Sequence, residues 1–374
     1  MSVMMPYDAH QLPTSVRSRF VPGVNGLTMH LLEAGRNEPA RPAVLLLHGF
    51  PELAFSWRNV MPALAAAGYY VIAPDQRGYG RTTGSLDDYD TDLAPFRLAN
   101  LVRDMLELLA ALGRDHVDAV IGHDFGAVVA PWAALIRPDV FRATVVMSAP
   151  FAGPPRLGET PVDPVHDDLL ALDRPRKHYQ WYYSTRPAND EMTRPPQGLH
   201  NFLRAYFHHK SADWAGNAPF KLSGWTATEL AKIPTYYIMD ADKDMPATVA
   251  EAMPAPDEIE ANTWLPDRDL ALYVNEYERT GFQGSLNWYR CRTQGVNDDL
   301  KLFAGRTIDV PAAFIGGAQD WGLRQVPGAL EAMQESACSD FRGCHLIDGA
   351  GHWVQQEQTA AVNDCLLAFL RDLK

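Results

Sequence analysis

The amino-acid sequence predicts an α/β protein, with a mostly parallel central sheet flanked by helices and one long, largely helical insertion. From about residue 26, short apolar runs alternate with longer amphipathic stretches, the pattern of strand–helix units around a parallel sheet. This alternation stops after Pro150 and resumes near Leu300. The chain has 374 residues, of which 47% are hydrophobic and 21% charged, so it can form a large core.

The elements before the insertion are short apolar runs and amphipathic stretches that end at turn residues. Ala43–Leu47 is too short for a buried helix and is closed by His48 and Gly49, which predicts a central strand. Apolar residues recur at helical spacing from residue 96 and stop at Gly113, a typical helix C-terminal glycine. The strands expected here are 43–47, 69–73, 118–121 and 143–147, and the helices are 96–112 and 127–136.

The insertion spans residues 151–300 and is rich in Pro, Tyr, Trp and His, with helical fragments such as 201–208. After it, we expect strands at 311–317 and 344–347 and helices at 325–336 and 359–373. The sequence therefore predicts a core domain, 1–150 with 301–374, and an inserted cap, 151–300. The Pro-rich stretch 222–266 fits a lid segment, a dimer contact or a surface excursion, so a homodimer formed through the cap is one hypothesis.

Composition excludes several classes of function. Lys and Arg total 33 against 46 Asp and Glu, a formal net charge of −13, which opposes binding to nucleic acid or anionic lipid. Neither a secretory signal nor a membrane-spanning apolar run is recognisable, so we expect a cytoplasmic protein without a membrane anchor. The four cysteines form no C-x-x-C pair and are interpreted as reduced structural thiols. We expect no metal and no cofactor.

Gly122, Asp124 and Gly126 carry the strongest chemical signal, because they form a G-x-D-x-G turn between a predicted strand and a predicted helix. Small residues at both ends permit the sharp strand-to-helix turn that exposes a nucleophile at its centre. Here the central residue is Asp124, and no G-x-S-x-G occurs, so a serine esterase or lipase is disfavoured. The sequence therefore predicts an aspartate nucleophile.

A general base and an acid that orients it follow later in the chain. His352 lies in a glycine-rich loop after the last predicted strand, where it can reach the C-terminal edge of the sheet. Asp320 and Asp244 both follow strand-like segments and compete for the role of the acid. We favour Asp320, since a helix, a strand and the His352 loop come after it in the order that this kind of sheet requires, whereas Asp244 lies inside the insertion.

Two clusters in the insertion, one with histidines and one acidic, have some features of metal sites, but neither is interpreted as one. His208 and His209 with Asp213 nearby are interpreted as part of a packed or solvated cap helix. Residues 240–251 mimic the spacing of a calcium-binding loop, yet Met245 occupies the position that needs glycine. Asp75 and Arg77, in a separate turn before the insertion, are interpreted as structural.

Four motifs together resemble those of the epoxide hydrolases with the α/β-hydrolase fold, over roughly residues 20 to 370. They are H-G-F-P-E at 48–52, G-H-D-F-G at 122–126, G-F-Q-G-S-L-N-W-Y-R at 281–290 and G-A-G-H-W at 349–353. The first two are shared with haloalkane and fluoroacetate dehalogenases, and the N-W-Y-R segment is the more specific. Phe50 and Phe125 stand where those dehalogenases place halide- or carboxylate-binding side chains, which favours the epoxide hydrolases.

The resemblance implies an enzyme that converts an epoxide and water into a vicinal diol through an ester on Asp124. It assigns two cap tyrosines, Tyr289 and Tyr179, to the epoxide oxygen, a role that suits a phenol because it stays protonated at neutral pH. It further implies the following assignments: oxyanion-hole amides from Phe50 and Phe125, a cis Phe50–Pro51 bond, and substrate contacts from Gln180, Trp181 and Trp288.

Two other hypotheses remain open from the sequence. A haloalkane dehalogenase-like enzyme would use the same Asp124, Asp320 and His352 but would release halide. A non-catalytic binding protein with the same fold would keep its activity after Asp124→Ala. The aromatic cap residues Trp181, Phe202, Phe207, Trp225 and Trp288 are expected to line an apolar tunnel above Asp124.

Overall fold

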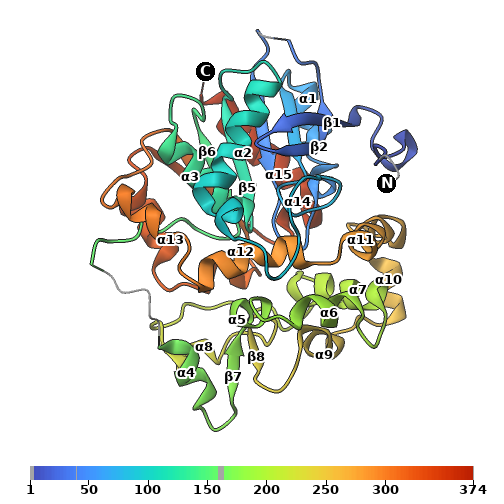
Figure 1. Ribbon diagram of the computed structural model, residues 1–374, viewed down its shortest axis with the longest axis vertical. Coiled ribbons are helices and arrows are strands. Elements are labelled where there is room, and N and C mark those ends of the chain that lie inside the picture. The colour runs from blue at the N-terminus through green and yellow to red at the C-terminus, as the bar shows by residue number, and fades with distance from the viewer. Residues whose placement is uncertain (1–3, 39, 159–163, 374) are drawn as a thin grey trace.

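The computed structural model describes residues 4–38, 40–158 and 164–373. Its centre is an eight-stranded sheet with the strand order β1-β2-β4-β3-β5-β6-β9-β10 (Figure 1). The strand bounds are β1 (Val16–Val24), β2 (Leu27–Ala34), β3 (Ala43–Leu47), β4 (Tyr70–Pro74), β5 (Ala119–His123), β6 (Thr144–Met147), β9 (Ala312–Gly317) and β10 (Phe341–Ile347). β2 runs antiparallel to β1 and β4, and the remaining neighbours are parallel, which confirms the predicted mostly parallel sheet.

Helices cover both faces of the sheet. α2 (Leu98–Ala111) and α3 (Gly126–Ile136) pack together on one face, and α1 (Met61–Ala66) and α15 (Thr359–Arg371) pack together on the other (Figure 1). Every residue of β3, β4 and β5 is buried. These strands therefore appear in the sequence as unbroken apolar runs, because both of their faces are covered.

Two features differ from the sequence-based expectation. The antiparallel pair β1 and β2 was not identified, since the half-exposed residues of β1 do not follow a clean alternation of polar and apolar side chains. The helix expected at 325–336 is only a short α13 (Ala329–Ala332) followed by a π-helical turn, Met333–Ala337. Pro327 cannot continue a helix, and Gly328 has a φ of +82°, so the helix begins only after them.

Between β6 and β9 the chain forms a mainly helical region at the lower end of the molecule in Figure 1. Its helices are α4 (Val165–Leu170), α5 (Tyr179–Tyr183), α6 (Ala188–Thr193), α7 (Leu199–Lys210), α8 (Ala227–Leu230), α9 (Met245–Ala250), α10 (Pro256–Ala261), α11 (Asp267–Thr280) and α12 (Gln283–Thr293). β7 (Arg176–His178) and β8 (Ile238–Asp240) pair antiparallel within it. The stretch 222–266 thus contains α8, β8, α9 and α10. The division into core and cap stays a prediction.

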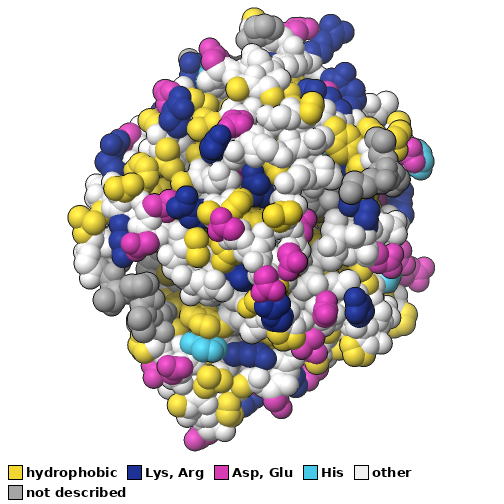
Figure 2. All heavy atoms as spheres, in the orientation of Figure 1, with side chains coloured by type: hydrophobic (Ala, Val, Ile, Leu, Met, Phe, Trp, Pro, Cys, Tyr) yellow, Lys and Arg dark blue, Asp and Glu magenta, His cyan; other side chains and the backbone are white. Residues whose placement is uncertain are grey.

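The face of the molecule in Figure 2 carries acidic and basic side chains that are interspersed with hydrophobic ones. The net charge of −13 is therefore not gathered into a single acidic patch on this face. Within the described ranges, no helix has the length and apolar character needed to cross a membrane.

Candidate active site

Asp124 lies at the sharp turn between β5 and α3, with a φ of +52° that L residues rarely adopt. The two glycines of the motif are needed for this turn. A Cβ on Gly122 would lie 1.9 Å from the carbonyl oxygen of Gly126, and one on Gly126 would lie 2.1 Å from that of Leu47. The turn therefore holds Asp124 at the C-terminal edge of the parallel strands, where this class of sheet binds ligands.

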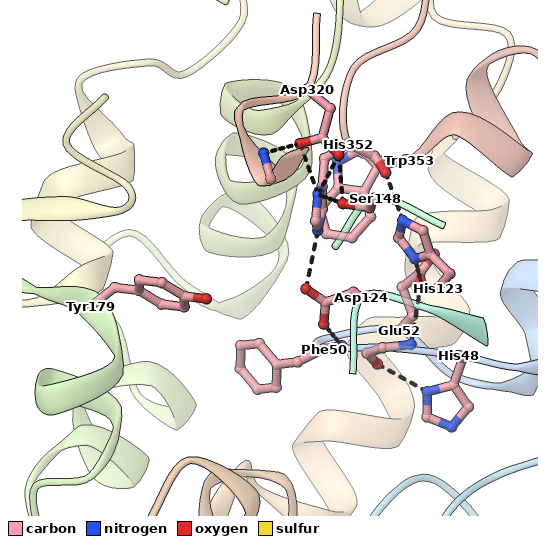
Figure 3. Close-up of polar contacts among 12 residues, drawn as sticks. His48, Phe50, Glu52, His123, Asp124, Ser148, Tyr179, Asp320, His352 and Trp353 are labelled. Atoms are coloured by element: carbon pink, nitrogen blue, oxygen red, sulfur yellow. Dashed lines mark hydrogen bonds and ion pairs between the residues drawn. The ribbon is translucent and has the colours of Figure 1, made fainter. Parts of the chain in front are cut away.

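Three predicted residues from separate loops come together at this edge (Figure 3). His352 Nε2 lies 3.4 Å from Asp124 Oδ2. On the other side of the ring, His352 Nδ1 lies 3.2 and 3.3 Å from the two carboxylate oxygens of Asp320. Asp320 also accepts a hydrogen bond from the backbone N–H of Gly322 at 2.6 Å. The alternative acid, Asp244, instead caps α9 by accepting the N–H of Ala247 at 2.7 Å.

Ser148, just after β6, was missed by the sequence analysis and lies between the acid and the histidine (Figure 3). Its hydroxyl donates to Asp320 Oδ2 at 2.5 Å and lies 2.9 Å from His352 Nδ1. Its φ is +72°, a conformation that is uncommon for a residue other than glycine. The one available signal was its position directly after a predicted strand, which many non-functional residues share.

The charges around the site favour ionised carboxylates. Burial opposes the ionisation of Asp124, but the contact with His352 and the nearby positive groups hold its pKa well below the usual range. Burial also opposes the ionisation of Asp320, whereas His352, Ser148 and the N–H of Gly322 together lower its pKa. Both lowered pKa values favour carboxylates at neutral pH, which is what the predicted roles of nucleophile and orienting acid require.

The loop after β3 supplies a hydrogen-bond donor to Asp124. The backbone N–H of Phe50 donates to Asp124 Oδ1 at 2.8 Å, and the Phe50–Pro51 peptide bond is cis, as the resemblance implies. Gly49 allows this approach, because a Cβ there would lie 2.3 Å from the Cβ of Asp124. Phe125, the second expected amide donor, directly follows Asp124 and is the N-cap residue of α3.

The two predicted tyrosines lie on different helices and face one cavity. Tyr179 begins α5 and Tyr289 belongs to α12, and their ring centroids are 5.8 Å apart. Tyr289 packs edge-on against Phe125 with the centroids at 4.5 Å, and the Tyr179 hydroxyl accepts a hydrogen bond from Gln180 Nε2 at 3.2 Å. Burial raises the pKa of Tyr179 to about 12 and that of Tyr289 well above 10, so both phenols carry their protons at neutral pH.

A cavity of about 890 Å³ joins these groups. Its walls include the predicted nucleophile, base, tyrosines and cap residues: Asp124, His352, Tyr179, Tyr289, Gln180, Trp181, Trp225 and Trp288. The expectation for Phe202 and Phe207 was wrong. Phe207 packs against Trp353 with the ring centroids at 4.6 Å, and Phe202 packs against Phe282 at 6.1 Å, so both belong to the packed interior.

A second buried pair, His123 and Glu52, supports the loop that carries His352. His123 Nδ1 lies 2.6 Å from Glu52 Oε2, and its Nε2 lies 2.7 Å from the carbonyl oxygen of His352. Both ring nitrogens thus face oxygen atoms that can accept a hydrogen bond, an arrangement that favours the imidazolium form. Burial opposes this charge, but Glu52 raises the pKa of His123. Sequence analysis missed this pair because its partners are far apart in the chain.

Glu357, in α14 (Val354–Glu357), accepts backbone hydrogen bonds on both sides of His352. Its carboxylate is 2.9 Å from the N–H of Gly351 and 2.8 Å from that of Trp353. A third bond at 2.7 Å comes from the N–H of Ala212, in the inserted region. Burial raises the pKa of Glu357 to about 8 even though three N–H groups favour the ionised form. The His352 loop is therefore tied to the residues that follow α7.

The remaining predicted residues lie in structural positions. Asp75 is buried and bonds His30 Nδ1 at 2.7 Å, and Arg77 forms a buried ion pair with Asp104 at 2.7 Å. Asp240, from the calcium-like stretch, pairs with Arg174. Among the residues that the structure describes, no group of three or more His, Cys, Asp or Glu side chains is arranged to hold a metal ion. All four cysteines are free.

Known proteins resemble this chain in both sequence and structure. The family model for the alpha/beta hydrolase fold matches residues 42–359. Epoxide hydrolase A of Mycobacterium tuberculosis is 33% identical, with 94% of this chain and 96% of that protein covered, and epoxide hydrolase B of the same organism is 34% identical over 93% and 97%.

Solved structures give the same result. The structure of an epoxide hydrolase from an endophytic Streptomyces superposes with a TM-score of 0.77 at 31% identity, covering 96% of this chain and 97% of that one. Potato (Solanum tuberosum) epoxide hydrolase I superposes with a TM-score of 0.73 at 30% identity, covering 96% and 99%. The chain therefore belongs to the epoxide hydrolases of the α/β-hydrolase fold.

Proposed function

We propose that this enzyme opens epoxides through a covalent ester on Asp124 and hydrolyses that ester with His352 as general base. The observation that carries the proposal is the contact between His352 and an ionised aspartate at the nucleophile turn, in a cavity that two protonated tyrosines also line. In this proposal residues 151–300 act as a cap over the core, 1–150 with 301–374, and supply both Tyr179 and Tyr289.

In the first step, a carboxylate oxygen of Asp124 attacks one epoxide carbon, and the bond from that carbon to the epoxide oxygen breaks. The oxygen leaves as an alkoxide that takes a proton from Tyr179 or Tyr289. A phenol suits this step, because it is protonated at neutral pH yet more acidic than the alcohol that forms. The product is a hydroxyalkyl ester of Asp124 and one tyrosinate.

In the second step, His352 removes a proton from water, and the hydroxide adds to Cγ of Asp124. The negative charge that develops on the former carboxylate oxygen is met by the N–H groups of Phe50 and Phe125. Collapse expels the diol oxygen, which takes the proton held by His352. Asp124 is left as a carboxylic acid with one oxygen and one proton from the water. That proton passes to the tyrosinate, which restores the enzyme.

Product analysis tests the reaction class. The purified enzyme is mixed with styrene oxide and 1,2-epoxyhexane in one reaction and with 1-bromobutane in another. Both diol and halide are measured in each reaction. We expect diol from the epoxides and no halide. Release of halide without diol formation would keep Asp124 as the nucleophile but overturn the roles given to Tyr179 and Tyr289.

Isotope and trapping experiments test the covalent step. One turnover in ¹⁸O-labelled water should place the label in the Asp124 peptide rather than in the diol, and label found directly in the diol would exclude the ester. His352→Gln should accumulate an adduct on Asp124 that is visible by intact mass. His200→Gln, which changes a half-exposed histidine on α7, is the matched control and should accumulate none.

A further inference from the structure

Lys210, the last residue of α7, is a buried lysine beside the site, and only 2% of it is exposed. Its ammonium nitrogen lies over four aromatic rings: Tyr237 at 4.9 Å, Trp353 at 5.3 Å, Tyr206 at 5.4 Å and Tyr236 at 6.0 Å from the ring centroids. Within the described part of the chain, it makes no ion pair and no side-chain hydrogen bond. The mechanism above does not use it.

The position of Lys210 is fixed relative to His352. The carbonyl oxygen of Lys210 accepts the backbone N–H of His352 at 2.9 Å, and Trp353, the next residue, is one of the four rings under the ammonium. Gly351 allows this close approach, because a Cβ there would lie 2.7 Å from the carbonyl oxygen of Lys210. The backbone of Lys210 is therefore tied to the His352 loop, and the ring of Trp353 connects its ammonium to the same loop.

Three acidic groups limit the effect of burial on Lys210. Burial lowers the pKa of Lys210, whereas Asp124, Asp320 and Glu52 act in the opposite direction. Four ring faces attract a cation as well, and such contacts are strongest where water is excluded. In turn, Lys210 is one of the groups that lower the pKa of Asp124.

We propose that Lys210 is a positioning residue whose buried positive charge keeps His352 neutral, and so able to act as a base, once Asp124 has become an ester. This inference rests on the covalent mechanism proposed above. The groups that face His352 are Asp124, Asp320 and Ser148 around its ring and the His123–Glu52 pair at its carbonyl. Glu357 faces the loop backbone on either side.

The charges of these groups explain how Lys210 keeps His352 neutral after the ester has formed. The imidazolium of His123 offsets Glu52. When Asp124 is esterified it loses its charge, which leaves Asp320 as the one unbalanced carboxylate next to His352. The ammonium of Lys210 offsets that charge, so with a neutral His352 the one negative charge left is the tyrosinate formed in the first step. If Lys210 is removed, the same state becomes one unit more negative, which favours a protonated His352 that cannot accept a proton from water.

The test separates the two chemical steps as a function of pH. Lys210→Met keeps the length of the side chain without its charge, Lys210→Arg keeps the charge, and Lys221→Met changes an exposed lysine elsewhere in the insertion. Rapid-quench mass spectrometry with styrene oxide follows the formation and decay of the adduct on the Asp124 peptide.

For Lys210→Met we expect the low-pH limb of the pH–rate profile for adduct decay to shift to higher pH by about one unit, the order expected for one buried charge nearby. Decay at pH values below that limb then slows about tenfold, whereas the plateau at high pH is kept. Lys210→Arg should restore the limb and Lys221→Met should not move it. An equal loss of rate at every pH, or an unmoved limb, would overturn the proposal.

A second measurement determines the charge of Lys210 in the wild-type protein, and it needs a variant only to assign the signal. In wild-type protein labelled with ¹⁵N-lysine, the Lys210 side-chain signal, assigned by its loss in Lys210→Arg, should be that of an ammonium through pH 8. A neutral amine at pH 7 would refute the inference. If no adduct forms in any variant, the covalent mechanism itself fails, whereas an adduct that decays with the wild-type pH dependence in Lys210→Met refutes the role of Lys210 alone.

Discussion

Replacing Ser148 by Ala should slow hydrolysis of the ester while leaving its formation unchanged. In the structure, the Nδ1–H of His352 has the Ser148 hydroxyl as its nearest acceptor, at 2.9 Å, and the carboxylate oxygens of Asp320 lie farther away, at 3.2 and 3.3 Å. The same hydroxyl is the shortest donor to Asp320, at 2.5 Å. The substitution therefore weakens the orientation of the base from both sides.

The size of the effect follows from the bonds that remain. A hydrogen bond to a charged group contributes about 1.5–3 kcal/mol. Asp320 keeps the N–H of Gly322 at 2.6 Å as well as His352, so the lower end of that range applies. Each 1.36 kcal/mol corresponds to a factor of ten in rate, so hydrolysis should slow about tenfold.

Rapid-quench mass spectrometry of one turnover measures both steps in the same experiment. In Ser148→Ala the adduct on the Asp124 peptide should appear at the wild-type rate and decay about tenfold more slowly, so that it accumulates. Ser336→Ala, which removes an exposed hydroxyl on the π-helical turn, serves as the control. If adduct formation slows by as large a factor as adduct decay, or if the adduct decays at the wild-type rate, this account of Ser148 is refuted.

Three further predictions concern the tyrosines and two buried charged groups. Tyr289→Phe and Tyr179→Phe should each slow adduct formation about 100-fold without changing adduct decay, and slower decay alone would contradict their role as proton donors. Arg77→Met leaves the carboxylate of Asp104, 1% exposed, without its cation, so the free energy of unfolding in urea should fall by about 3–5 kcal/mol; a loss under about 1 kcal/mol would contradict a strong pair. Burial opposes the ionisation of Asp75, but His30 and neighbouring groups lower its pKa to about 2. Because this pKa is lower than that of the unfolded chain, Asp75 stabilises the fold above about pH 4, and the contribution is lost as the pH falls toward 2. The difference in unfolding free energy between wild type and Asp75→Asn should therefore shrink over that range, and a constant difference would show that ionisation is not its source.

The sequence predicted those parts of the fold that local patterns determine. The buried strands β3, β4 and β5 appear as continuous apolar runs, and α3 follows its glycine-bracketed turn. Around the site, Asp124 and His352 could be selected because each lies in a glycine-rich loop next to a predicted strand. Asp320 could be preferred to Asp244 from chain order alone.

Other features depend on contacts between distant residues and have no local signal. Ser148 is an ordinary serine in sequence, and its role becomes visible only when β6 brings it to Asp320. The buried partners Glu52 and His123 belong to recognised motifs, but nothing in those motifs indicates that they pair. The basic residue Lys210 ends an amphipathic helix, where a cation is usually solvated, and its burial follows from the fold of the inserted region.

The three N–H bonds accepted by Glu357 have a consequence for making chimeric enzymes. One of these donors, Ala212, comes from the inserted region, and the other two, Gly351 and Trp353, stand on either side of His352. A graft whose backbone follows a different path after α7 would displace a donor of the Glu357 side chain and the carbonyl partner of His352 at the same time. Residues 210–212 and 351–357 should therefore come from the same parent sequence. A library that recombines them separately should yield proteins that keep the cavity but position His352 less precisely.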